Sequence, residues 1–103
     1  MDFDFPYHGL HFVWDVEKAS MNLRKHNLRF ESACHVFLDP LIQIEDAGDG
    51  LATSPEERFA AIGFAQNRKL LFVVHLVREK EVIRILSARE ATAQERKRYE
   101  DNE

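Results

Sequence analysis

Apolar residues recur along the chain with two periods, and each period predicts one kind of element. Between residues 16 and 23 they recur every three or four positions, which predicts a helix to about His26. Asp15 suits the N-cap of this helix, because its carboxylate can accept a hydrogen bond from a first-turn amide. Residues 30–37 follow the same spacing, and Pro40 ends this second helix because the residue before a proline avoids helical angles.

Short apolar runs without helical spacing predict five strands. The first strand, residues 10–14, precedes the two helices, and residues 41–47 form an edge-like strand with a polar face. A loop rich in glycine and polar residues follows at 48–55. Three further strands, joined by turns short enough for antiparallel hairpins, are expected at residues 58–65, 70–78 and 82–88.

A last helix begins at Thr92, which forms a capping box with Glu95. Residues 1–10 precede the first strand as an irregular extension, and residues 11–103 form one domain, because the chain is long enough for a single hydrophobic core. The predicted order is β-α-α-β-β-β-β-α. It indicates an α+β fold with two helices packed on an antiparallel sheet and a C-terminal helix at one edge.

The formal net charge of −4 conceals an uneven distribution of charge. Residues 39–57 contain six acidic residues and no basic one, whereas residues 58–98 contain ten basic residues and four acidic ones. We interpret the acidic stretch as a solvated loop, with contact to a basic partner as the alternative. The basic C-terminal half keeps an anionic ligand such as RNA in consideration despite the acidic total.

Composition argues against several classes of protein. The longest apolar run, residues 70–74, is too short to cross a bilayer, and the N-terminus lacks the pattern of a signal peptide. We therefore expect a cytoplasmic protein without membrane contact. Cys34 is the only cysteine and lies on an apolar helix face, which indicates a core residue. His8 and His11, and His35 beside Cys34, lack further ligands at suitable spacing, so we expect no metal and no cofactor.

Several short motifs resemble the BrnT family, the toxin half of BrnT/BrnA type II toxin-antitoxin pairs. In chain order the motifs are FVWDVEKA (12–19), NLRKH (22–26), FESA (30–33), FLDP (37–40), ERF (57–59), IG (62–63), LFVVH (71–75), IRILSAR (83–89), ER (95–96) and Tyr99. NLRKH and IRILSAR are the most specific of them. The resemblance implies a RelE-like fold, a ribonuclease that inhibits translation, and a BrnA-like antitoxin that neutralises it.

Two positions depart from the family pattern. Asn27 follows the NLRKH motif, and Asn67 opens the turn at 67–69, where the family usually has glycine. Asparagine adopts left-handed backbone angles more readily than most residues. Both substitutions are therefore compatible with the same fold.

The steps of metal-independent RNA cleavage determine which types of residue its active site needs. The 2′-hydroxyl attacks the adjacent phosphate, and the enzyme orients the backbone, neutralises the phosphoryl oxygens and transfers protons. The forked guanidinium of arginine pairs with two phosphate oxygens, so Arg58, Arg84 and Arg89 are catalytic candidates. A surface salt bridge is the alternative for Arg58, and a tie between the strand end and the last helix is the alternative for Arg89.

Histidine is the first choice for proton transfer, because it titrates near neutral pH. His26 at the end of the first helix and His75 within a strand are candidates. The alternatives are a favourable charge at the helix C-terminus for His26 and a core position for His75. Lys25, Arg24 and Tyr99 are candidates for binding RNA, with core packing as the alternative for Tyr99.

Arg84 within the predicted strand at 82–88 and Arg89 directly after it pose a geometric condition. Arg84 and Arg89 have opposite parity along the strand, so they meet one phosphate only if the strand bends or ends between them. A second hypothesis for function is a non-catalytic binding module that acts with an antitoxin in DNA-binding autorepression. In that case DNA is contacted only indirectly through the antitoxin, and residues 96–98 are the basic helix segment closest to this pattern.

Overall fold

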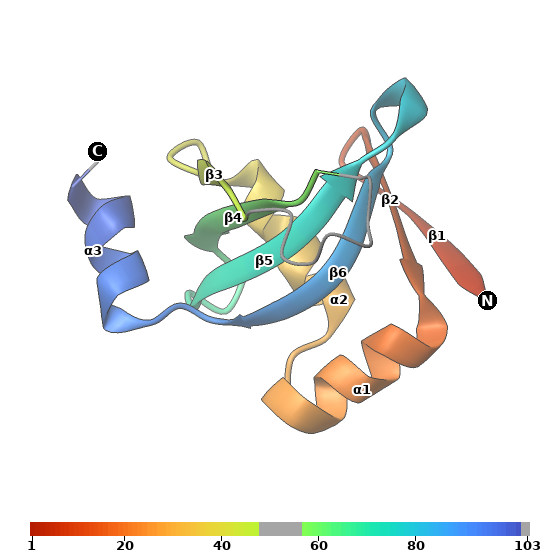
Figure 1. The fold of residues 1–103 in the computed structure, drawn as a ribbon, viewed down its shortest axis with the longest axis horizontal. Helices are drawn as coiled ribbons and strands as arrows, with labels where there is room; N and C mark the ends of the chain where they lie inside the picture. The colour runs from red at the N-terminus through yellow and green to blue at the C-terminus, as the bar shows by residue number, and fades with distance from the viewer. Residues whose placement is uncertain (48–56, 102–103) are drawn as a thin grey trace.

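The computed structural model describes residues 1–47 and 57–101, which form a six-stranded sheet and three helices (Figure 1). The strands are β1 (Asp2–Tyr7), β2 (Leu10–Asp15), β3 (Gln43–Asp46), β4 (Phe59–Phe64), β5 (Leu70–Val77) and β6 (Ile83–Glu90). Their spatial order is β1-β2-β6-β5-β4-β3, in which β2 and β6 run parallel and the other neighbours run antiparallel. The predicted loop at 48–55 lies outside the described residues.

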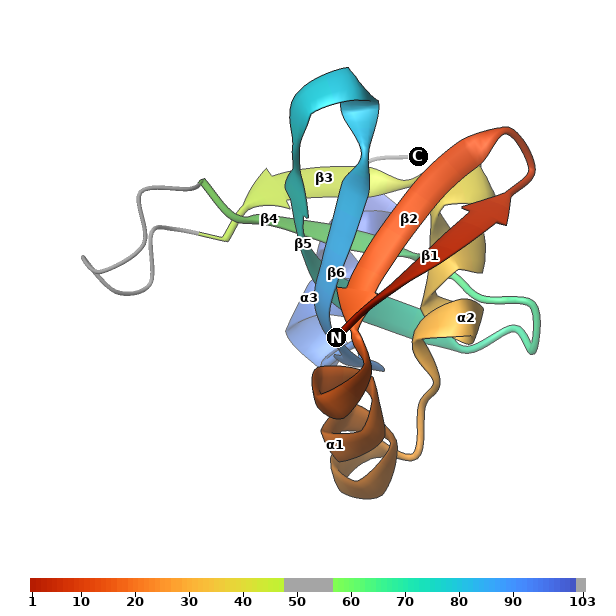
Figure 2. The same cartoon turned by 90° about the vertical axis from the view of Figure 1, so that its right-hand side faces the viewer.

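The helices confirm the α+β class and the predicted order of elements from residue 10 onward. They are α1 (Val16–His26), α2 (Phe30–Cys34), which continues into the 3-10 helix η1 (His35–Leu38), and α3 (Ala93–Asp101); a second 3-10 turn, η2 (Glu79–Glu81), joins β5 to β6. Figures 1 and 2 show α2 on one side of the sheet, α3 on the other and α1 along the end of β6. Among the described helices, none combines the length and apolar character needed to cross a bilayer.

Local hydrogen bonds explain why the helices begin and end as predicted. The Asp15 carboxylate accepts a hydrogen bond from the Lys18 amide at 3.0 Å, which confirms the N-cap of α1. Asn27 ends the helix in the left-handed region with φ 56°. Thr92 and Glu95 form the predicted capping box, with side chain to backbone distances of 2.9 and 3.2 Å.

The prediction that residues 1–10 are irregular is wrong. Residues 2–7 form β1, which pairs antiparallel with β2 from Asp2 opposite Asp15 to Tyr7 opposite Leu10. A two-residue turn with positive φ at both positions joins them, the geometry that suits a hairpin. The alternation of acidic and aromatic side chains in DFDFPY is the period of a strand and could have revealed it.

The main core lies between the sheet and α2, and it is apolar. Its buried members are Phe12, Trp14, Leu28, Phe30, Ala33, Cys34, Val36, Ala61, Ala65, Leu71, Val73, Ile85 and Ala88. The Cys34 side chain is fully buried, and burial raises the pKa of its thiol, which confirms the core position. A smaller cluster on the opposite face contains Ile62 and Leu70 of the sheet and Tyr99 of α3.

Asn22 fixes α1 against β6. Its side-chain amide donates a hydrogen bond to the Ala88 carbonyl at 2.9 Å and accepts one from the Ala88 amide at 3.0 Å. It also donates to the Leu28 carbonyl at 3.1 Å. A side chain of α1 thus satisfies both backbone groups of Ala88, much as a neighbouring strand would.

Candidate functional site

A β-bulge in β6 decides which of its side chains share a face. Val74 and His75 are consecutive in β5, but their partners in β6 are Ser87 and Ile85. Leu86 is therefore the extra residue of the bulge. The alternation of side chains restarts after it, so positions on either side of Leu86 follow different parities.

The bulge brings Arg84, Ser87 and Arg89 to one face of the sheet. Arg84 lies opposite Leu76 and Arg89 lies opposite Phe72, two β5 residues that share a face because four positions separate them. This face is opposite to the main core. We call it the arginine face.

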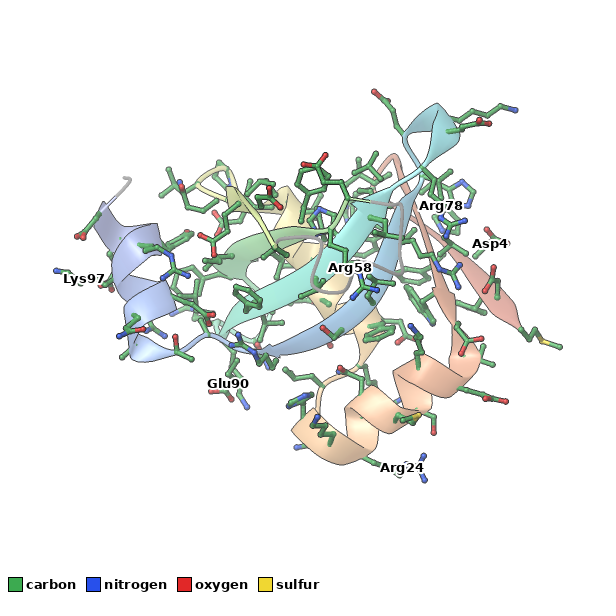
Figure 3. All side chains as sticks on the ribbon, viewed as in Figure 1. Asp4, Arg24, Arg58, Arg78, Glu90 and Lys97 are labelled. Carbon is green, nitrogen blue, oxygen red and sulfur yellow. The ribbon has the colours of Figure 1, made fainter. Side chains whose placement is uncertain are left out.

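Arg58 belongs to the same face and has a polar atom without a partner. It directly precedes Phe59, the partner of His75, so the alternation places its side chain with Ala60 rather than with Phe59. Figure 3 shows the side chain of Arg58 in front of the sheet. Of the buried side-chain nitrogen and oxygen atoms in the described part of the chain, the Nε of Arg58 is the one that has no hydrogen-bond partner. A buried donor of this kind is costly, and an anionic ligand would satisfy it.

Arg84 is held by a carboxylate from β1. Its two terminal nitrogens donate to the two oxygens of Asp2, each at 3.0 Å. The Arg84 side chain is 17% exposed and that of Asp2 is 54% exposed. The hydrogen bond with Arg84 lowers the pKa of Asp2. This bidentate pair has the geometry with which arginine also binds phosphate.

Arg89 is held by α3. Its terminal nitrogens donate to both oxygens of Glu95 at 2.8 Å, and its guanidinium lies 4.2 Å from the centre of the Phe72 ring. The hydrogen bonds with Glu95 raise the pKa of Arg89, and the same pair lowers the pKa of Glu95. Arg89 therefore ties the end of β6 to α3, which is the alternative considered for this residue.

A basic groove of about 500 Å³ lies between α1 and β6. It is lined by Lys18, Met21, Asn22, Arg24, Lys25, His26, Leu86 and Ser87. The groove brings together three of the predicted residues, Arg24, Lys25 and His26. Lys18 was not predicted, although its spacing of seven from Lys25 places both on one side of the helix. Ser87 belongs to both the groove and the arginine face, so the two surfaces adjoin.

The structure buries His75 and Tyr99. His75 is 3% exposed on the core side, with its ring centre 4.9 Å from that of Phe37 and 6.0 Å from that of Phe59. Burial lowers its pKa. Tyr99 is a buried residue of α3 that packs against the sheet, and its hydroxyl donates to Asp39 at 2.7 Å. The positions of both residues correspond to the core alternatives.

Lys97 and Arg98, in the basic segment at 96–98, lie close to acidic residues. Arg98 donates two hydrogen bonds to Glu45, at 3.1 and 2.9 Å, and Lys97 lies 3.8 Å from Asp101. Within residues 1–47 and 57–101, no group of three or more histidine, cysteine, aspartate or glutamate side chains is placed to hold a metal ion.

Comparisons with known proteins agree with the fold. A family model described as "Ribonuclease toxin, BrnT, of type II toxin-antitoxin system" matches residues 14–95. The chain is also similar to the 1.1 Å crystal structure of the Brucella abortus ribonuclease toxin BrnT, with 25% sequence identity and a TM-score of 0.58. That similarity covers 77% of this chain and 92% of the Brucella chain. No curated protein matches the chain.

Proposed function

Because the chain belongs to the BrnT family of ribonuclease toxins of type II toxin-antitoxin systems, we propose that it is a metal-independent endoribonuclease that inhibits translation. The 2′-hydroxyl of the substrate attacks the neighbouring phosphate, and the 5′-oxygen of the next nucleotide leaves. The products are a 2′,3′-cyclic phosphate and a 5′-hydroxyl. One proton leaves the attacking oxygen, and one is delivered to the leaving oxygen.

The buried Nε of Arg58 carries this proposal. Among the described residues the Nε of Arg58 has no hydrogen-bond partner, so an anion that reaches it would satisfy this donor without displacing another group. The guanidinium fork can pair with two oxygens of a phosphate and stays charged at every relevant pH. We assign to Arg58 the stabilisation of charge that develops on the phosphoryl oxygens.

The groove supplies the remaining functions. Lys18, Arg24 and Lys25 neutralise neighbouring phosphates of the RNA substrate, since their side chains line one groove. His26 lines the same groove and is the histidine that we assign to proton transfer. His75 is not assigned a role in catalysis, because its ring lies in the core on the other side of the sheet.

A cognate antitoxin neutralises the toxin. A BrnA-like protein that covers the groove must compete with RNA for the same cations. We therefore expect it to bring acidic or aromatic side chains to this surface. Co-expression with the product of an adjacent small gene, followed by co-purification, tests for this partner.

RNA cleavage in the presence of EDTA tests the enzymatic proposal. The purified chain should cut RNA with the chelator present and should leave 2′,3′-cyclic phosphate ends, detectable by their resistance to direct 3′ ligation. Products with free 3′-hydroxyl ends, or an activity that returns only with a divalent cation, would contradict the mechanism. Induced expression should also stop protein synthesis in cells.

A further inference from the structure

We propose that Asp2 competes with RNA phosphate for Arg84, so that β1 determines how tightly the arginine face binds RNA. The proposal rests on the function proposed above, because it takes RNA as the ligand of this face. It assigns a role to an element that precedes the residues matched by the BrnT family model, 14–95.

The geometry of the pair supports competition. Both terminal nitrogens of Arg84 donate to Asp2, one to each carboxylate oxygen at 3.0 Å. A phosphate uses the same two donors in the same planar arrangement. The two anions cannot both occupy this edge of the guanidinium. RNA therefore gains the bidentate contact with Arg84 only by displacing Asp2.

The position of Asp2 makes displacement feasible. It is the first residue of an edge strand, and its side chain is 54% exposed. The side chains that anchor β1 point to the other face, where the ring of Phe5 lies 5.5 Å from that of Trp14 and the Tyr7 hydroxyl bonds His35 at 2.9 Å. The Asp2 side chain can therefore leave Arg84 while these aromatic contacts hold the rest of the strand.

Asp4 provides a matched control for Asp2. It lies two positions later on the same strand and the same face, and it carries the same charge. Its carboxylate lies 2.9 Å from His11 and is 69% exposed. Neutralising either aspartate removes one negative charge near the arginine face, but only the Asp2 substitution removes the bidentate carboxylate contact between Asp2 and Arg84.

The experiment measures binding of the full chain to a short RNA whose 2′-hydroxyls are methylated, so that cleavage cannot occur. Fluorescence anisotropy at about 0.15 M salt, which screens charges beyond about 8 Å, gives the dissociation constants. We expect Asp2→Asn to tighten binding roughly two- to fivefold, the range of an exposed ion pair, and Asp4→Asn to change it less. In an Arg84→Gln background the gain from Asp2→Asn should vanish.

Equal effects of Asp2→Asn and Asp4→Asn would overturn the proposal, because they would show a general effect of charge. A gain that persists in the Arg84→Gln background, or no binding by any variant, would also overturn it. Thermal unfolding of each variant confirms that the compared chains are folded, and Asp2→Ala repeats the test without an amide. Cleavage of unmodified RNA by the wild-type chain is measured separately, so failure of the enzymatic proposal is recognised independently.

Discussion

The side chains of Arg84 and Arg89 lie on the same face of the sheet, although an odd number of positions separates them along β6. Residues of opposite parity share a face only if the strand bends or ends between them. The bulge at Leu86 meets this condition, because the alternation of side chains restarts after it. Both guanidinium groups are nevertheless held by carboxylates, Asp2 and Glu95. A phosphate must compete for Arg84 and Arg89, whereas the Nε of Arg58 lacks such a partner in the described structure.

Arg58→Met should separate activity from stability. We expect the rate of RNA cleavage to fall by a factor on the order of 10²–10³, because the group that stabilises charge on the phosphate is lost. The melting temperature should stay the same or rise, since methionine fills similar space without an unsatisfied buried donor. Single-turnover cleavage of a labelled RNA and thermal unfolding measure the two effects.

Arg96→Met is the matched control for this substitution. Arg96 is an exposed residue of α3, so the same chemical change at that position should leave the cleavage rate unaltered. Wild-type activity of Arg58→Met would remove Arg58 from the proposed site. A large fall in its melting temperature would instead indicate that the guanidinium has a structural role.

The two histidines can be compared by the same substitution. His26→Gln should slow cleavage by a factor on the order of 10²–10⁴, because it removes the group assigned to proton transfer. His75→Gln should leave the cleavage rate of the folded protein unchanged. It should lower stability, because His75 packs between Phe37 and Phe59. Cleavage rates and melting temperatures are measured for both variants. Slow cleavage by a folded His75→Gln variant together with normal cleavage by His26→Gln would transfer the catalytic role to His75.

Elements whose stop and start signals are local could be predicted from the sequence. The N-cap Asp15 and the capping box of Thr92 and Glu95 bond residues three positions away, so a short window of sequence contains both partners. β1 depends instead on pairing with β2, and the prediction missed it because Asp2, Asp4 and Pro6 disfavour a strand locally. In the turn at 67–69 the left-handed residue is Arg68 rather than Asn67.

The candidate site could be predicted only in part, because side-chain partners are set by tertiary structure. Glu95 is six positions from Arg89, and the alternative of a tie between Arg89 and the last helix did not name it as the partner. Asp2 is 82 positions from Arg84, and no local pattern connects them. Parity alone could not indicate that α2 covers the face of His75. The groove was partly predictable, because Arg24, Lys25 and His26 are consecutive.

Asn22→Leu should destabilise the fold strongly. The substitution removes three hydrogen bonds and leaves the Ala88 amide and carbonyl without their side-chain partner at the junction of α1 and β6. We expect a loss of about 2–4 kcal/mol in the free energy of unfolding, measured by urea denaturation. Asn67→Leu, in an exposed turn, is the control and should cost much less. A similar loss in both variants would show that the contact with Ala88 has no special weight.

Glu95→Gln should remove a pH-dependent part of the stability. The hydrogen bonds from Arg89 hold the pKa of Glu95 below its ordinary value of 4.5. A carboxyl group whose pKa is lowered by folding stabilises the native state fully above its unfolded pKa, and this stabilisation is lost as the pH falls through the folded pKa. At pH 7 we expect the variant to be less stable by about 1–3 kcal/mol.

The difference between the two proteins should therefore shrink as the pH falls below about 4.5, because the wild-type carboxylate becomes protonated while the amide does not titrate. Urea denaturation of the wild-type chain and the Glu95→Gln variant from pH 7 to about pH 3 measures this difference in the free energy of unfolding. Glu90→Gln is the control: its carboxylate is 63% exposed and paired with Lys69, so its loss should cost less than about 1 kcal/mol. A difference for Glu95→Gln that is constant over this range would mean that packing and helix capping, rather than the charge pair with Arg89, account for the stabilisation.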